Sequence, residues 1–113
     1  MKRSQVDITE VKKPAIIALI CKEQVDKAVK YLEDNYAPTQ AELLRSQFLK
    51  IVRLLEIMPG LGTPYKNGMR KMGLGKFRRY NIYYRELETE IEILGILHTS
   101  RGVEFTDIYN PQL

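Results

Sequence analysis

His98 is the chain's single histidine, and it ends a strongly apolar run near the C-terminus. An imidazole beside arginines and a tyrosine can cleave RNA, because free imidazole titrates near neutral pH. Such a site needs a base for the 2′-hydroxyl proton, cations for the phosphorane and an acid for the leaving oxygen. The residues that could meet these needs, if neighbouring strands bring them together, are Arg79, Tyr84, Arg85, His98 and Arg101. A lone histidine at a strand end is, however, more often a structural hydrogen-bonding residue.

The basic residues are concentrated in one segment. Lys66 to Arg85 contains seven of the 18 basic residues and no Asp or Glu, so 11 basic residues face 14 acidic ones elsewhere. A cationic patch of this kind attracts nucleic acid or an acidic protein. The segment is therefore interpreted as a binding surface, the alternative being a solvated sheet face. Tyrosines interleaved with the arginines would also suit a nucleic-acid stacking platform, although no motif of a known nucleic-acid module is present.

The length and composition predict a single domain. A chain of 113 residues, with 44% hydrophobic and 28% charged residues, can build one core, and we expect the domain to span residues 1–113. The longest apolar run, Ala15 to Cys21, is too short to span a membrane, and the basic N-terminus has no signal-peptide core behind it. A cytoplasmic location without membrane contact is expected.

The first half of the chain predicts a strand and two helices. Ser4 to Thr9 alternates as a strand does, and Thr9 is the expected N-cap of a helix with Pro14 in its first turn. The second helix is expected to begin with a capping box at Thr39 and Glu42 and to end before Pro59. The apolar stripes are Ile17, Cys21, Val25, Ala28, Leu32 and Tyr36 in the first helix, and Ala41, Leu44, Phe48, Ile51, Leu55 and Met58 in the second.

The second half changes to strand periodicity. Strands are expected from Met69 to Leu74, from Lys76 to Glu86, and from Ile91 to His98. The last of these is apolar on both faces, as an inner strand is. In the middle strand, Tyr80, Ile82 and Tyr84 are expected on one face, and the other face is assigned Phe77, Arg79, Asn81, Tyr83 and Arg85. Residues 102–113 carry weak signals for a short helix, a strand or a tail.

The predicted fold class is therefore α+β. The element order is β-α-α-β-β-β, with a helical hairpin packed on a mainly antiparallel sheet. Cys21 falls on the buried face of the first helix and, being alone, offers neither an intrachain disulfide nor a cysteine cluster. No spacing in the chain implies a metal or another cofactor.

Three strings on these elements resemble the RelE/ParE toxin superfamily, and ParE-like toxins most closely. They are the helix end Leu54–Gly62, the arginine- and tyrosine-rich strand Phe77–Arg85, and the final strand Ile91–Arg101 with its His-x-x-Arg ending. The resemblance covers about residues 4 to 101. It implies a toxin of a type II toxin–antitoxin system, forming a small oligomeric complex with a cognate antitoxin that wraps the helices and sheet.

The resemblance agrees with an apolar arc on the second helix that is wider than a helical hairpin needs. Surplus apolar surface on a small protein usually marks a partner site. The alternative is that these residues simply face the sheet. The residues expected to contact the antitoxin are Leu43, Phe48, Leu54, Ile57 and Tyr83.

The resemblance leaves two targets open, and DNA gyrase is favoured. Nucleases of the superfamily typically carry an arginine at the position of Asn81. One subgroup also uses a His-Tyr pair, which falls here on Thr99 and Ser100, and a glutamate that falls near Tyr65. These departures remove catalytic groups, whereas ParE-like members poison gyrase by contact alone. The expected target-binding residues are Arg78, Arg79, Arg85 and Arg101. The alternatives are a RelE-like ribosome-dependent mRNA endonuclease, a plain binding module and a degenerate family member.

Overall fold

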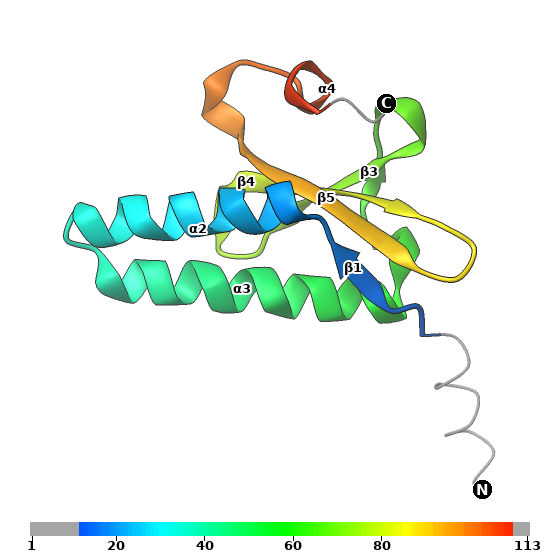
Figure 1. Cartoon of the computed structure of the whole chain (residues 1–113), viewed down its shortest axis with the longest axis horizontal. Coiled ribbons are helices and arrows are strands. Elements are labelled where there is room, and N and C mark those ends of the chain that lie inside the picture. The colour runs from blue at the N-terminus through cyan, green and yellow to red at the C-terminus, as the bar shows by residue number, and fades with distance from the viewer. Residues whose placement is uncertain (1–11, 110–113) are drawn as a thin grey trace, which may run out of the picture.

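A computed structural model of the chain describes residues 12–109, and for Arg78 and Arg101 it describes the backbone alone. A hairpin of two long helices lies along a twisted sheet, and the C-terminal part of the chain crosses to the other side of that sheet (Figure 1). The main elements in chain order are β1 (Ala15–Ile17), α2 (Leu19–Asp34), α3 (Pro38–Ile57), β2 (Thr63–Pro64), β3 (Arg70–Leu74), β4 (Phe77–Glu86), β5 (Ile91–His98) and α4 (Phe105–Ile108). Short 3-10 turns are η1 (Pro59–Leu61), η2 (Lys66–Gly68) and η3 (Thr99–Arg101).

The first helix begins later than its periodicity predicts. The expected helix from Thr9 is wrong at its start, because residues 15–17 form β1 and α2 begins only at Leu19. Pro14 disfavours helical backbone at the residue before it, and the β-branched pair Ile16 and Ile17 favours a strand. The predicted strand Ser4–Thr9 lies outside the described residues.

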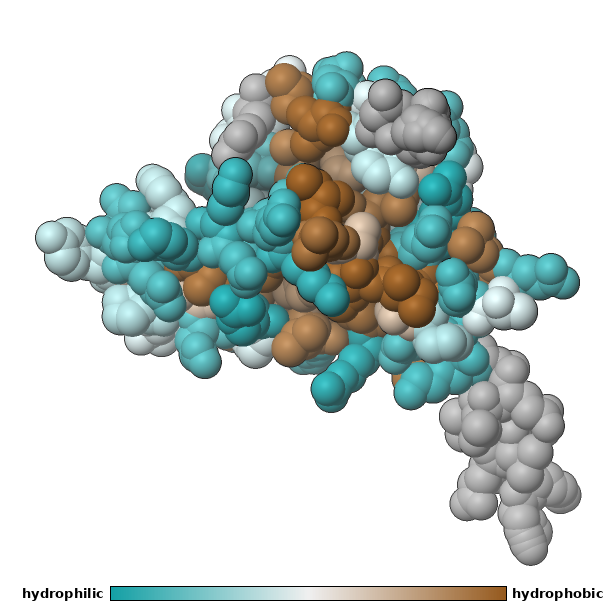
Figure 2. Space-filling view, in the orientation of Figure 1, coloured by the Kyte–Doolittle hydropathy of each residue, from teal (hydrophilic) through white to brown (hydrophobic). Residues whose placement is uncertain are grey.

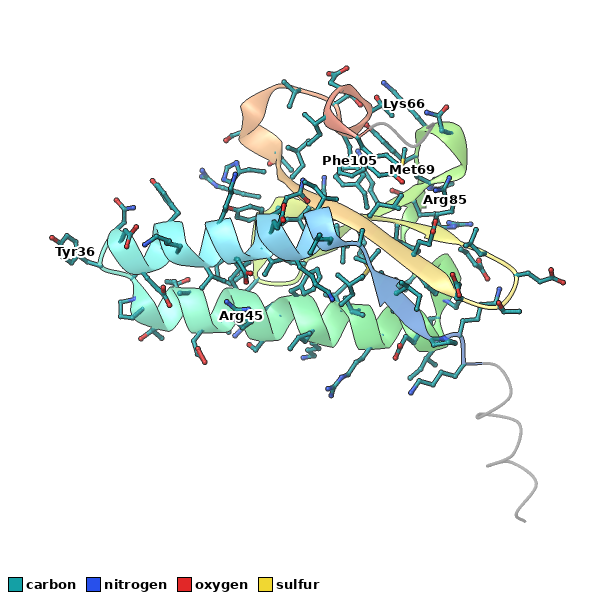
Figure 3. The ribbon with its side chains drawn as sticks, in the orientation of Figure 1. Tyr36, Arg45, Lys66, Met69, Arg85 and Phe105 are labelled. Carbon is teal, nitrogen blue, oxygen red and sulfur yellow. The ribbon has the colours of Figure 1, made fainter. Side chains whose placement is uncertain are left out.

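Most of the predicted stripe of α2 is confirmed. Cys21, Val25 and Ala28 are buried and Leu32 is half-buried, whereas Tyr36 is 94% exposed with a φ of 62° at the tip of the hairpin (Figure 3). Tyr36 fails to join the stripe because the helix has already ended at Asp34. Burial raises the pKa of the Cys21 thiol to about 12.

The second helix packs as predicted but begins differently. Ala41, Leu44, Phe48, Ile51 and Leu55 are buried, and Met58, just beyond the helix, is half exposed. The predicted capping box at Thr39 and Glu42 does not form, because the N-cap is Ala37 and Thr39 already lies inside the helix, which begins at Pro38. Proline suits a first helical position, since its missing N–H has no partner to lose there.

The sheet has five strands in the order β1-β5-β4-β3-β2. The predicted antiparallel meander of β3, β4 and β5 is confirmed, and β1 joins its edge parallel to β5, with Ala15 opposite Ile91. The short β2, which carried no sequence signal, pairs with β3 on the far edge. The fold is therefore α+β, as the order of elements predicted, and the parallel pairing of β1 makes the mainly antiparallel sheet a mixed one.

Each face of the sheet has its own apolar cluster. The helix-side core contains the buried stripes of α2 and α3 together with Leu74, Ile82, Tyr84, Ile91, Ile93 and Ile96. The opposite-face cluster consists of Met69, Tyr83, Leu94, Leu97 and Phe105. Phe77 packs against the helix-side core, so its predicted place beside Tyr83 is wrong. The ladder between β3 and β4 skips from Asn81 to Phe77, and this irregularity breaks the simple alternation.

Candidate functional site

Tyr84, one of the residues considered for RNA cleavage, is a structural residue. Its side chain is fully buried, and its hydroxyl donates to the carbonyl of Pro59 at 2.6 Å and accepts from the N–H of Gly62 at 2.9 Å. Burial raises the pKa of Tyr84, so the phenol stays protonated. A hydroxyl enclosed in this way ties the end of α3 to β4 and is inaccessible to a substrate.

Arg70, a member of the basic segment, also binds the loop at residues 59–62 that the Tyr84 hydroxyl contacts. Arg70 Nη1 donates to the carbonyl of Gly62 at 2.7 Å. A Cβ at Gly62 would lie 2.7 Å from both the Lys71 carbonyl oxygen and the Tyr84 hydroxyl, which is closer than real contacts allow. Position 62 therefore requires glycine, and the guanidinium of Arg70 is occupied in holding the loop.

Arg85 and His98 lie toward opposite ends of the paired strands. Arg85 is opposite Glu92 and binds its carboxylate, with Nη2 at 3.1 Å and Nε at 3.2 Å, whereas His98 is opposite Tyr80. Five residues of extended chain separate Tyr80 from Arg85, or about 16 Å. The expectation that strand pairing brings Arg85 beside His98 is wrong, because the meander runs these two strands in opposite directions.

His98 retains a local structural role. Its Nδ1 accepts from the backbone N–H of Ser100 at 3.2 Å and lies 2.6 Å from the Ser100 hydroxyl. Its ring meets Tyr80 edge-on, with centroids 4.9 Å apart. Of the arginines considered with it, Arg79 is next to Tyr80 in sequence and is exposed, and Arg101 is in the turn η3 that follows.

A polar cluster on the opposite face escaped sequence analysis. The hydroxyl of Tyr65 donates to Glu104 at 2.8 Å and accepts from the N–H of Phe105 at 3.0 Å, while Lys66 Nζ is 3.3 Å from the Glu104 carboxylate. The hydrogen bond from Tyr65, together with the Lys66 ammonium, holds the pKa of Glu104 below its ordinary value. About forty residues separate these partners, so no local pattern could have indicated the contact.

The basic segment is thus partly committed to the fold. Arg70 and Arg85 have the partners described above, Lys66 pairs with Glu104, and Lys71 lies 5.5 Å from the centre of the Tyr65 ring. Lys76, in the turn between β3 and β4, and Arg79, near the start of β4, are exposed. A cationic surface available to a partner is therefore concentrated at that end of the sheet.

The residues expected to contact an antitoxin fall into two groups. Phe48 lies in the helix-side core and Tyr83 in the opposite-face cluster, so both side chains are buried in the free chain and their contact with an antitoxin stays a prediction. Leu43 and Leu54 are half-buried on α3, and Ile57 is 51% exposed. Helical periodicity places residues on a face but does not reveal how much of that face the sheet covers.

Further apolar surface lies at the start of α2 and on β1. Figure 2 shows apolar side chains gathered there, and the exposed residues are Ile16, Leu19 and Ile20. Sequence reasoning missed this patch because it placed these residues inside a longer first helix. The surface of α3 also carries a shallow open groove, in which Leu43 and Leu49 are the apolar residues. Its lining residues are Thr39, Glu42, Leu43, Arg45, Ser46 and Leu49.

The described part of the chain offers neither a cluster of metal ligands nor a membrane-spanning helix. Residues 12–109 contain no group of three His, Cys, Asp or Glu side chains placed to hold a metal ion. Over the same range, none of the helices is both long enough and apolar enough to cross a membrane.

The helical hairpin packed on a mixed five-stranded sheet is a ParE-like fold. The chain belongs to the family described as ParE toxin of type II toxin-antitoxin system, parDE, whose model matches residues 18–103. A similar solved structure is a chain of the chromosomal ParDE TA system from P. aeruginosa, with a TM-score of 0.68 and 19% identity over 77% of this chain and 96% of that one. A search of curated proteins found no match.

Proposed function

We propose that this ParE toxin inhibits DNA gyrase through protein–protein contact and is neutralised by a cognate antitoxin in the cytoplasm. The observation that carries the choice of target is the dispersal of the residues considered for RNA cleavage. Tyr84 is enclosed in the core, Arg85 is paired with Glu92, and His98 lies at the other end of the strand pair. Gyrase inhibition by contact requires a surface and no acid–base centre.

The target surface is the cationic end of the sheet. Lys76 and Arg79 are exposed there, and the backbone of Arg78 belongs to the same strand end. Acidic side chains of a partner would be steered to these basic residues, and reversing one of the charges would repel them. We retain Arg101 as a contact because η3 directly follows the strand end that pairs with Tyr80.

The antitoxin surface is the exposed apolar part of the helix layer. Ile57 on α3 and the patch formed by Ile16, Leu19 and Ile20 present apolar side chains to solvent. An amphipathic antitoxin segment would bury them, as helix-in-groove partners do, and the half-buried Leu43 and Leu54 would flank the contact.

Gyrase supercoiling in the presence of the purified chain tests the target. We expect inhibition, and we expect Arg79→Glu to raise the half-inhibitory concentration at least about tenfold by reversing a contact charge. Arg53→Glu makes the same charge change at an exposed position of α3 and should leave inhibition unchanged. Undiminished supercoiling at saturating toxin, or equal effects of the two variants, would contradict the proposal.

Message integrity in a translation extract tests the alternative. We expect the messages to remain intact when the chain is added. If they are cleaved, and His98→Ala abolishes the cleavage while Arg53→Glu does not, then the chain is a nuclease and the gyrase proposal fails.

The antitoxin contact is tested with the product of the neighbouring reading frame. Leu19→Glu and Ile57→Glu place a charge in the proposed contact and should weaken binding by about 2 kcal/mol or more each. Tyr36→Glu alters a still more exposed side chain at the far tip of the hairpin and serves as the control. Unchanged affinity in both test variants would place the antitoxin on another surface.

A further inference from the structure

A cavity of about 540 Å³ lies at the open edge of β5, between α2 and α4. Strand β1 pairs only with Ile91 to Ile93, so the remainder of β5 continues without a strand on that side, with α2 and the η3–α4 region on either side of it (Figure 1). The cavity is lined by Gln24, Lys27, Ala28, Tyr31, Tyr80, Ile96, Leu97, His98 and Ile108. Its volume lies within the range of small-molecule sites.

Three of the lining residues, Gln24, Lys27 and His98, carry nitrogen groups that are hydrogen-bond donors. Because Nδ1 of His98 accepts from Ser100 N–H, the neutral ring carries its proton on Nε2, which is a donor. The side-chain oxygen of Gln24 accepts from Ile96 N–H at 2.9 Å, which leaves its amide nitrogen, again a donor. Lys27 adds an exposed ammonium.

No acidic side chain is among the lining residues, so an anion entering the cavity meets donors and a positive charge without repulsion. Lys27 and Tyr31 are one helical turn apart on the same face of α2, which places a cation beside an aromatic ring.

The remaining walls are apolar and aromatic. Tyr31 and Tyr80 contribute rings, and Ile96, Leu97 and Ile108 contribute aliphatic surface. Rings and aliphatic groups accommodate a flat apolar body, while the donors fix a charged end. A ligand that satisfies both parts combines an aromatic ring with a carboxylate or a phosphate.

We propose that the edge cavity binds a small aromatic anion, with its ring against the two tyrosines and its carboxylate or phosphate against Lys27 and His98. None of the residues that line the cavity belongs to the surfaces proposed for gyrase and antitoxin, although Arg79 and Arg101 lie close in the chain to the lining residues Tyr80 and His98. The proposal therefore does not depend on that function. Free aromatic carboxylates and mononucleotides share this chemistry, and the choice of probes distinguishes them.

Calorimetric titration of the full chain with adenosine 5′-monophosphate and with indole-3-acetate tests the proposal. At least one probe should bind with a Kd of about 0.1 mM, and adenosine, indole or inorganic phosphate alone should bind at least about tenfold more weakly. Binding of the nucleotide alone would assign a phosphate end, and binding of the indole acid alone would assign a carboxylate end.

Three variants make the result specific. Lys27→Gln removes the cation and Ile108→Glu adds an acid to an exposed lining position, and each should weaken binding about tenfold. Lys30→Gln is the control, because Lys30 lies outside the cavity and pairs with Asp34 on the same helix. No binding of either probe at about 1 mM, or equal losses in Lys27→Gln and Lys30→Gln, would overturn the proposal.

Discussion

The two faces of the sheet are covered in very different ways. Two helices of 16 and 20 residues cover the helix-side core, whereas the four-residue α4 covers the opposite-face cluster. On that second face Phe105 stacks on Tyr83, with ring centroids 4.3 Å apart, and Tyr109 stacks on Phe105 at 5.2 Å. One face is thus stabilised by contacts spread along two long helices. On the other face, the described contact of α4 with the sheet centres on the buried ring of Phe105, which we call the aromatic anchor.

The polar contacts of the two faces also differ in their exposure to solvent, and those of α4 are the more exposed. Glu104, which begins α4, is exposed, and its bonds to Tyr65 and Lys66 reach the helix from the loop before β3. On the other face the hydroxyl of Tyr84 is enclosed by backbone groups. We therefore expect α4 to open locally while the helix-side core remains intact, since local stability increases with buried contact and decreases with solvent exposure.

The largest expected effect comes from the helix-side core. Leu55 is fully buried there, and Leu55→Ala should lower the free energy of unfolding by about 2–5 kcal/mol, because the cavity it leaves cannot fully collapse. Urea denaturation followed by circular dichroism measures the change. Leu61→Ala alters an exposed leucine and is the control. A loss below about 1 kcal/mol would show that this face is as loosely held as the other.

The next largest effect on the free energy of unfolding is expected from removing the Tyr84 hydroxyl. Tyr84→Phe keeps the ring but leaves the Pro59 carbonyl and the Gly62 N–H without their partner, which should cost about 1–3 kcal/mol. Tyr36→Phe, at an exposed ring, should cost nothing measurable. If Tyr84→Phe were equally stable yet abolished toxicity, the hydroxyl would have a functional role instead of a structural one.

Loss of the aromatic anchor should act locally. Phe105→Ala should release α4 and expose Tyr83, Leu94 and Leu97, but lower the global free energy of unfolding by only about 1–2 kcal/mol, since so short a helix adds little to the rest. Hydrogen exchange should show faster exchange at the Tyr109 amide, which bonds to Phe105, and unchanged exchange in α3. Uniformly faster exchange in both would make the two faces one cooperative unit.

The smallest effect is electrostatic and depends on pH. Because the pKa of Glu104 is lowered in the folded chain, its contribution to docking α4 is present at neutral pH and is lost as the pH falls through that lowered pKa. The NMR shift of the Phe105 amide, which bonds to Tyr65, reports the change. In Glu104→Gln the acid-dependent shift should disappear. Its persistence there would assign the titration to another group.

Sequence periodicity predicted the helical hairpin and the three late strands because both depend on local patterns. The stripe from Ala41 to Leu55 and the two-sided apolar run of β5 are buried as expected. Periodicity failed at Ala15–Ile17, where a strand pairs with a segment more than seventy residues away. It also could not detect that Phe77 packs against the helix-side core, because a register irregularity changes the alternation.

The candidate site was predictable only as a set of residue types. The acid-free basic segment could be read directly from the chain, but not the engagement of Arg70 and Arg85 by partners within the fold. Likewise Phe48 and Tyr83 were identifiable as large apolar residues, while their burial depended on what covers each face.

The amino-acid sequence by itself determined the order of elements, the apolar stripes and the uneven charge, since each follows from the spacing of side chains along a regular backbone. Only the tertiary structure decided which hydroxyl is enclosed, which arginines remain available and which residues line the cavity beside β5. Those outcomes depend on strand direction and register, which bring together segments that no local pattern connects.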